Sequence, residues 1–328
     1  MRALVLRKFT RHLVVTLALM GAGIGVAAAQ DYPNRPIRVI TSIGAGGTWD
    51  IFVRRLSEEV TKTWGHPFVI ESKPGGAWMI SGRTCASADP DGYTLCALSG
   101  ETLIHPEFLN KSVPYDTQTA FAPIVNFFFT TQILVVNASL KAQTYGDLAK
   151  VARAQPKSLA FVGPGLSNKL FLDRFNREFS TDIVYVPFRG GGDALNNMLQ
   201  GSIQMALFGL TNFVPYLRDG SMVGLAVDGD ERSGMFPNVP TAREVGYEGP
   251  LVRNYLGMVA PAGTPKPIID KVNAELVRII RNPDFAKRFM IDMGLEPIAD
   301  TPEHFAAFLK SDREQFQQVI RETGVEPQ

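Results

Sequence analysis

Cysteine and histidine are scarce in this chain of 328 residues, which contains two cysteines and four histidines. Beyond residue 29 only His66, His105 and His304 remain, and none stands at ligand spacing from another histidine, a cysteine or a carboxylate. This scarcity gives no support to a structural zinc or to zinc catalysis. The chain also lacks Gly-Lys-Ser/Thr and Gly-x-Ser-x-Gly, so a P-loop and a hydrolase nucleophile elbow are both absent.

An excess of one charge is missing as well. The chain has 33 basic and 32 acidic residues, a formal net charge of +1. The first 29 residues contain four of the basic residues and no acidic ones, so the remainder carries a net charge of −3. Such a balance offers no electrostatic basis for binding nucleic acid.

Long apolar runs are limited to residues 13–26, LVVTLALMGAGIGV. Four basic residues precede this run, and Ala27-Ala28-Ala29 follows it. The pattern predicts a secretory signal peptide over residues 1–29, with an apolar part too short to span a bilayer. No cysteine stands near the cleavage point, so a lipoprotein anchor is not expected. We therefore expect a soluble mature chain, 30–328, in the periplasm.

The two cysteines, Cys85 and Cys96, flank the segment ASADPDGYTL. This segment is typical of a helix end, an Asp-Gly turn and a following strand. Helix and strand would run back past each other, so a disulfide is geometrically possible in an oxidising compartment. Two buried thiols are the alternative.

Apolar, β-rich runs alternate with amphipathic helical segments over most of the chain. This alternation predicts an α/β fold, with a mainly parallel sheet covered by helices in each domain. The 299 residues after the leader exceed the usual single core, so two domains are expected. Ligands of such sheets bind beyond the carboxyl ends of the strands.

Four loops share one design, in which a strand runs into glycines and then into a helix. They are the segments 44–50 (GAGGTWD), 73–82 (KPGGAWMISG), 163–169 (GPGLSNK) and 188–194 (FRGGGDA). Glycines let backbone N–H groups turn toward a ligand, and a helix start adds partial positive charge. In the first loop Trp49 occupies the place of the third glycine of a dinucleotide fingerprint. The loops therefore indicate an anion held by amides between two domains, with no nucleotide cofactor.

Several motifs together resemble the Bug family, the extracytoplasmic solute-binding proteins of tripartite tricarboxylate transporters. These motifs are YPNRPIRVI, GAGGTWDI, ESKPGG, ADPDGYTL, VPFRGG, NVPTAREVGY and APAGTPKPIIDKVNAEL. The resemblance implies a type II periplasmic binding protein that is not an enzyme. It also implies two lobes that close on a small carboxylate, and a two-component membrane permease as partner. Lobe I would comprise 30–130 and 253–328, and lobe II 131–252, joined by crossover strands near 127–133 and 251–257.

The resemblance also implies a set of ligand contacts in the glycine loops. In lobe I they fall on Gly46, Gly47, Thr48, Asp50, Gly75, Gly76 and Ala77. In lobe II they fall on Ser167, Asn168, Lys169, Arg189, Gly190 and Gly191. Asp50 has two compatible roles, as a helix N-cap worth ~1 kcal/mol or as a group that orients water or a donor.

This chain departs from the family pattern in the same loops. Ala77 and Trp78 replace glycines, Trp49 replaces a small residue, and Lys169 replaces a histidine. Further aromatic surface comes from Phe188 and Phe208.

Two hypotheses follow from these departures. In one, the rings stack on an aromatic or bulky carboxylate, with Lys169 or Arg189 meeting a distal acidic group. In the other, the two tryptophans pack against the lobe surface and fill the cleft, which favours a C4–C6 dicarboxylate.

The sequence thus favours a monomeric periplasmic protein that captures an organic carboxylate for a transporter. A ligand-dependent partner of a sensor kinase is the first alternative, because it needs the same cleft. An exported enzyme, with a hydrolytic dyad assembled in three dimensions, is the second.

Overall fold

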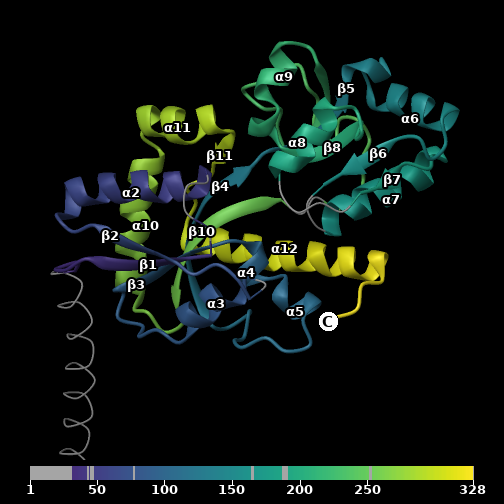
Figure 1. Cartoon of the computed structure of the whole chain (residues 1–328). Coiled ribbons are helices and arrows are strands. Elements are labelled where there is room, and N and C mark those ends of the chain that lie inside the picture. Colours follow the sequence, from purple (N-terminus) through teal and green to yellow (C-terminus); the bar gives the residue numbers. More distant parts are fainter. Residues whose placement is uncertain are drawn as a thin grey trace, which may run out of the picture.

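The fold is an α/β architecture built on two separate sheets (Figure 1). The computed structural model describes residues 32–327, except 43, 45–47, 77, 164–165, 187–190 and 251–252, and gives only the backbone of 191–194. The predicted signal peptide therefore lies outside the described residues. The predicted fold class is confirmed.

The first sheet has six strands in the order β11-β4-β10-β3-β1-β2. Their bounds are β1 Ile37–Thr41, β2 Phe68–Ser72, β3 Thr94–Leu98, β4 Phe121–Thr130, β10 Asn254–Pro261 and β11 Leu295–Pro297. β1 pairs with β2 and β3 in parallel, whereas β10 pairs with β3 and β4 in antiparallel fashion. β11 is also antiparallel to β4.

The second sheet has five strands in the order β7-β6-β8-β5-β9. Their bounds are β5 Gln132–Asn137, β6 Ala160–Val162, β7 Val184–Tyr185, β8 Met205–Gly209 and β9 Met222–Val227. β6 is parallel to β7 and β8, and β5 is antiparallel to β8 and β9. Both sheets are therefore mixed, and the prediction of mainly parallel sheets is wrong. The strands that connect the two sheets, β4–β5 and β10, run antiparallel to a neighbouring strand.

Helices flank both sheets. Those of the first sheet are α2 Thr48–Trp64, α3 Met79–Ala86, α4 Gly100–Leu103, α5 Pro106–Leu109, α10 Lys266–Ile280, α11 Pro283–Phe289 and α12 Pro302–Thr323. Those of the second are α6 Tyr145–Ala154, α7 Leu166–Phe179, α8 Gly191–Leu199 and α9 Val214–Arg218, and single 3-10 turns occur at η1 Ala138–Leu140, η2 Leu210–Asn212 and η3 Ile291–Met293. Among the described residues, a helix with the length and apolar character needed to cross a membrane does not occur.

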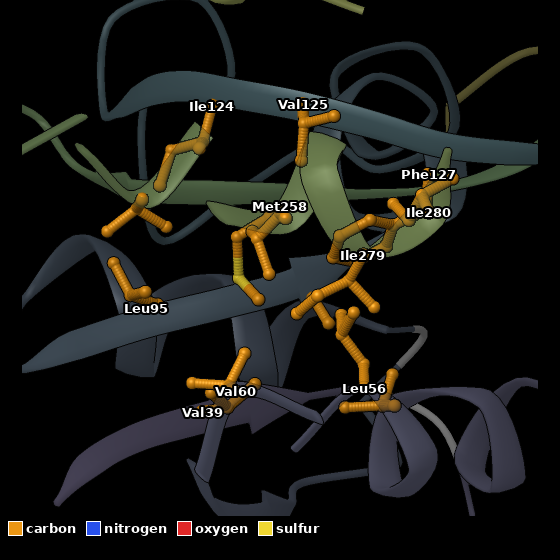
Figure 2. Packing of buried hydrophobic residues seen from close by; sticks show 14 of the residues in the cluster. Val39, Leu56, Val60, Leu95, Ile124, Val125, Phe127, Met258, Ile279 and Ile280 are labelled. Atoms are coloured by element: carbon orange, nitrogen blue, oxygen red, sulfur yellow. The ribbon is translucent and has the colours of Figure 1, made fainter. Parts of the chain in front are cut away.

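Each sheet has its own hydrophobic core, built from the periodicity of the sequence. On α2, Val53, Leu56 and Val60 recur at helical spacing and are fully buried. They meet β10 and α10, as the packing of Leu56 and Val60 below Met258 and Ile279 shows (Figure 2). This packing holds α2 against the first sheet and so sets the position of its N-terminus.

A disulfide joins Cys85 at the end of α3 to Cys96 in β3. The sulfur atoms are 2.07 Å apart and both residues are fully buried. Of the two alternatives for these cysteines, the structure has the bonded one. The bond closes the turn between helix and strand.

The C-terminal helix α12 connects the two halves of the molecule. Its Phe305 and Phe316 are buried beside the first sheet, and its far end lies beside α7 of the second sheet (Figure 1). There Arg174 of α7 donates two hydrogen bonds to Glu322 of α12, of 2.5 and 2.9 Å. Both side chains are about three-quarters buried, so this bidentate pair is an interaction between the two halves.

Buried polar groups gather around Gly100 at the start of α4. A Cβ atom on Gly100 would lie 3.5 Å from both Asp312 Oδ2 and His105 Nε2. The His105 ring stacks on Phe316 with centroids 3.8 Å apart, and burial holds the pKa of His105 below its usual value. Burial, reinforced by Glu101, raises the pKa of Asp312 to about 7. Asp312 is therefore favoured in its neutral form inside the fold.

We expect the variant Asp312→Asn to gain stability relative to the parent protein as the pH rises from about 5 to 8. An unfolded aspartate ionises near pH 3.9, so between the two pKa values the native state binds one proton more than the unfolded state. The stability contribution of Asp312 therefore falls as pH rises, by at most ~1.4 kcal/mol per pH unit. Urea unfolding at several pH values measures the difference.

His105 titrates in the opposite sense, since burial lowers its pKa, so its titration opposes that of Asp312 in the parent protein. Asp270→Asn is the matched control, because Asp270 lies half-exposed on α10, paired with Lys266. The difference in the free energy of unfolding between Asp270→Asn and the parent protein should not change over this pH range. Equal slopes for the two variants would contradict the role given to Asp312.

Candidate ligand-binding site

The carboxyl ends of the strands in the two sheets face each other. β4 ends at Thr130 on the same edge as the ends of β1, β2 and β3, because β10 is antiparallel to both β3 and β4. β5 begins at Gln132, on the edge where β8 and β9 end. Only Thr131 separates these two strands, so both edges meet there. In α/β sheets this edge is where ligands bind.

A cavity of about 170 Å³ lies at this meeting point. Its walls come from both sheets, and its described lining is Thr48, Trp49, Thr130, Gln132, Phe208, Gly209, Thr211, Asn212, Asn254, Met293 and Leu295. Each of these lining residues is uncharged. Thr48 is the first residue of α2, so the positive end of the helix dipole is directed at the cavity. This lining suits an anion that is held by neutral donors.

Trp49 forms one wall of the cavity and is locked in place. Its indole Nε1 donates a hydrogen bond of 3.0 Å to Thr130 Oγ1. Its ring meets Phe128 edge-on, with centroids 5.9 Å apart, and packs against the first core. Trp49 therefore packs against its own lobe, as the second hypothesis expects, and it still borders the cavity.

Trp78 adopts a backbone conformation that suits glycine. Its φ is 70°, in the left-handed region, and Gly75 and Gly76 before it also have positive φ. The carbonyl of Trp78 accepts hydrogen bonds from Ser81 Oγ (3.0 Å) and Thr102 Oγ1 (3.3 Å). The residue is 46% exposed, so Trp78 does not pack against its own lobe as the second hypothesis expects. The backbone at residue 78 has a conformation that favours glycine although the residue is a tryptophan.

Asp50 is the third residue of α2 and not its N-cap, so the prediction of an N-cap role is wrong. Its side chain is buried and accepts a hydrogen bond of 2.9 Å from Arg54 Nε one turn later. A carboxylate in the first turn still interacts favourably with the helix dipole. The local pairing with Arg54 makes this residue part of the helix start.

The second-sheet candidates lie in the first turn of α7. Asn168 is buried, and its Nδ2 donates to Gln132 Oε1 (3.2 Å) and to the carbonyl of Leu207 (3.0 Å). Ser167 lies beside it on the wall of a smaller cavity. Lys169 is half-exposed and its Nζ is 2.5 Å from Asp173 Oδ2, so its charge is paired within the helix.

Other predicted contacts are placed only in part. Phe208 at the end of β8 is half-buried and lines the larger cavity, and Gly191 begins α8. Six predicted contacts lie outside the described residues: Gly46, Gly47, Ala77, Phe188, Arg189 and Gly190.

Sequence reasoning missed Gln132, Asp228 and Asn254. Gln132 and Asn254 are polar residues at the first position of an apolar strand and Asp228 directly follows one, which is the signal that could have revealed them. Asp228 Oδ1 accepts a hydrogen bond of 2.7 Å from the backbone N–H of Gln132. The backbone N–H of Asp228 in turn donates a hydrogen bond of 3.1 Å to the backbone carbonyl of Gln132. Burial raises the pKa of Asp228 to about 6, although Arg253 opposes the shift. Sequence separation hid this pairing, because the two residues are 96 positions apart.

Arg253 carries the principal buried positive charge next to the site. Its Nη2 lies 2.5 Å from Glu296 Oε2 and its Nη1 lies 3.6 Å from Asp230 Oδ2. The guanidinium also lies 4.1 Å over the Phe129 ring. The described residues contain no group of three His, Cys, Asp or Glu side chains that could hold a metal.

Comparison with known proteins gives consistent matches. The sequence profile of the tripartite tricarboxylate transporter family receptor matches residues 52–325. A UPF0065 protein of Bordetella bronchiseptica is 29% identical over 97% of this chain and 94% of its own. Protein BugT of Bordetella pertussis is 27% identical over 95% of this chain and 98% of its own. The structure of MatC from Rhodopseudomonas palustris with bound malate is 27% identical, with a TM-score of 0.69 over 88% of this chain and 100% of that one.

We expect Trp78→Gly to leave stability unchanged or to raise it by up to ~1 kcal/mol. A left-handed conformation destabilises an L-residue by roughly 1–2 kcal/mol, and the larger unfolded-state entropy of glycine offsets part of the gain. Chemical denaturation measures the change.

Ile80→Gly is the matched control for this substitution. Ile80 is also 46% exposed but lies within helix α3, where glycine destabilises by about 1 kcal/mol. A loss at Trp78 as large as the loss at Ile80 would show that the backbone does not favour glycine at residue 78.

Proposed function

The chain belongs to the tripartite tricarboxylate transporter family of receptors, and on this premise we propose that it captures a C4–C6 dicarboxylate for a two-component membrane permease. Membership of this family makes it a solute-binding receptor of a periplasmic transport system and not an enzyme. The observation that carries the proposal is the uncharged cavity where the two strand edges meet. Beyond family membership we propose the identity of the acid, a permease as the partner and an export signal.

The chemistry of the cavity suits a carboxylate. Thr48 places the start of α2 at the cavity wall, and hydroxyl and amide side chains supply further donors. Backbone N–H groups at a helix start bind anions without a cationic side chain. MatC, a relative of similar length, binds the dicarboxylate malate.

The cavity at the two strand edges favours flexible aliphatic acids over flat aromatic ones. Its volume of about 170 Å³ is well below the ~300–1,000 Å³ of pockets for drug-sized ligands. The Trp49 ring already occupies one wall and is held there by Thr130 and Phe128. A benzoate-type acid would have to displace this ring, whereas a short aliphatic diacid would not.

Binding is coupled to closure of lobe I (30–130 and 253–328) on lobe II (131–252) in this proposal. Only a closed form contacts the ligand from both strand edges, so ligand shifts the equilibrium toward closure. The disulfide between Cys85 and Cys96 suits an oxidising compartment, in keeping with removal of a signal peptide, residues 1–29, on export.

A panel of acids tests the proposal by calorimetry and thermal shift. We expect succinate, malate, glutarate or adipate to raise the unfolding temperature, since ligand at 100 times its Kd adds ~2.7 kcal/mol of stability. Benzoate and phthalate should give no shift, because Trp49 fills the space that their rings need.

Trp49→Ala supplies the matched variant, because it opens the wall and should admit the ring-bearing acids. Sodium chloride at equal ionic strength controls for salt effects. Binding of benzoate to the parent protein with no response to any aliphatic diacid would contradict the assignment of the ligand class.

A further inference from the structure

Arg174 and Glu322 join the two halves of the molecule at a point outside the candidate site. Arg174 of α7 donates hydrogen bonds from Nε and Nη2 to the two carboxylate oxygens of Glu322 in α12, at 2.9 and 2.5 Å. Gln318, one turn earlier in α12, donates a further hydrogen bond of 2.8 Å to Glu322 Oε1. These hydrogen bonds, chiefly those from Arg174, hold the pKa of Glu322 below its usual value, so the carboxylate stays charged.

The position of Glu322 in its own helix is unfavourable for a carboxylate. Glu322 is the penultimate residue of α12, which ends at Thr323 and has Gly324 as its C-cap. The negative end of the helix dipole repels a carboxylate in the last turn. The planar fork of Arg174 offsets this repulsion with two charge-assisted hydrogen bonds. Glu322 is therefore stabilised mainly by the other half of the molecule.

Each partner is fixed to its own sheet. Phe171 and Phe175, on either side of Arg174 in α7, are buried in the core of the second sheet. Phe316, in the same helix as Glu322, is buried in a cluster with residues of the first sheet. The contact between α7 and α12 lies away from β4 and β10, where the chain crosses between the sheets (Figure 1). A rotation of one half about the crossing therefore changes the position of Arg174 relative to Glu322.

α7 connects this pair with the candidate site. The helix begins at Leu166, its first turn contains Asn168, and Arg174 follows less than two turns later. A movement of the first turn toward a ligand therefore moves Arg174 as well. Residues of the loops that are to close on the ligand remain accessible, because Trp78 is 46% exposed and the side chain of Lys169 is 45% exposed. The pair is thus formed in an arrangement in which the cleft is open.

We propose that the Arg174–Glu322 pair stabilises the open arrangement of the two lobes, so that its strength sets the apparent affinity for the solute from outside the cleft. This inference rests on the proposed function, because it requires lobes that close on a ligand. The apparent Kd of a ligand that binds the closed form is its intrinsic Kd divided by the closed fraction. Loss of the pair raises this fraction and lowers the apparent Kd of every acid by the same factor. Both residues are positioning residues, since neither belongs to the described lining of the larger cavity.

Calorimetry with succinate, malate, glutarate and adipate tests the inference. Glu322→Gln removes the charge and keeps the shape of the side chain, and each acid that binds the parent protein should bind it at least about threefold more tightly. The order of the acids should not change, because the substitution acts on closure and not on contacts with the ligand. Glu314→Gln is the matched control, since Glu314 is an exposed residue of the same helix. Its affinities should stay within about twofold of those of the parent protein.

Variants of Arg174 separate a positioning role from a purely structural one. Arg174→Gln should reproduce the gain in affinity, and Arg174→Lys should give a smaller gain because lysine keeps the charge without the planar fork. In the double variant Arg174→Gln/Glu322→Gln the gain should stay within about twofold of the larger single gain, because both substitutions remove one interaction. A role confined to folding would lower stability without tightening binding.

Single-molecule fluorescence energy transfer measures closure without any acid. Dyes on Arg83→Cys in α3 and Asn196→Cys in α8 label exposed positions on two helices that follow glycine loops. Closure brings these loops together and shortens the separation of the dyes. Adding Glu322→Gln to this labelled protein should raise the fraction of closed molecules at least about threefold.

Three results would overturn the inference. They are a closed fraction that does not rise in Glu322→Gln, binding of the acids by that variant that is unchanged or weaker, and a gain confined to some of the acids. Absence of binding by every acid, in the parent protein and the variants alike, would instead contradict the proposed function. The closed fraction measured without acid would still decide the inference in that case.

Discussion

The crossing of the chain between the two sheets at Thr131 is the constraint on which the site depends. One residue separates the end of β4 from the start of β5, so the two strand edges cannot move far apart at this point. The Thr131 carbonyl accepts a hydrogen bond of 2.9 Å from the Leu210 amide, which ties the crossing to the end of β8. Side chains at the strand ends of both sheets therefore converge here. The cavity is a consequence of this topology.

Charge is distributed unevenly around the crossing, and the distribution has a physical reason. The larger cavity has an uncharged described lining, while Arg253 and its carboxylate partners lie beside it. A cation inside the cavity would be desolvated and unpaired whenever the ligand was absent, which is strongly unfavourable. Neutral donors and a helix start avoid this penalty. Asp228, which lines the smaller cavity, is buried, and its Oδ2 makes no hydrogen bond within the described part of the chain.

The two tryptophans in the glycine loops beside the first sheet lie in different surroundings. The sequence marked both as departures from the family pattern, and it offered stacking on a ligand or packing on the lobe as alternatives. The structure separates the two residues: Trp49 is packed and hydrogen-bonded, and Trp78 is exposed on a left-handed backbone. Side-chain direction at a helix start depends on what lies across it, here Thr130 and Phe128, and these residues are about 80 positions away in the sequence.

Local pattern determined the elements, and long-range contact determined the site. The sequence by itself was sufficient for the strand–helix alternation, the glycine loops, the family and the possible cysteine bridge, because periodicity and turn chemistry act over a few residues. It could not show the mixed strand directions or the role of Asp50 within the helix. Only the tertiary structure decided that Gln132, Asn168 and Asp228 adjoin one another, because sheet pairing brings together residues that local pattern cannot relate.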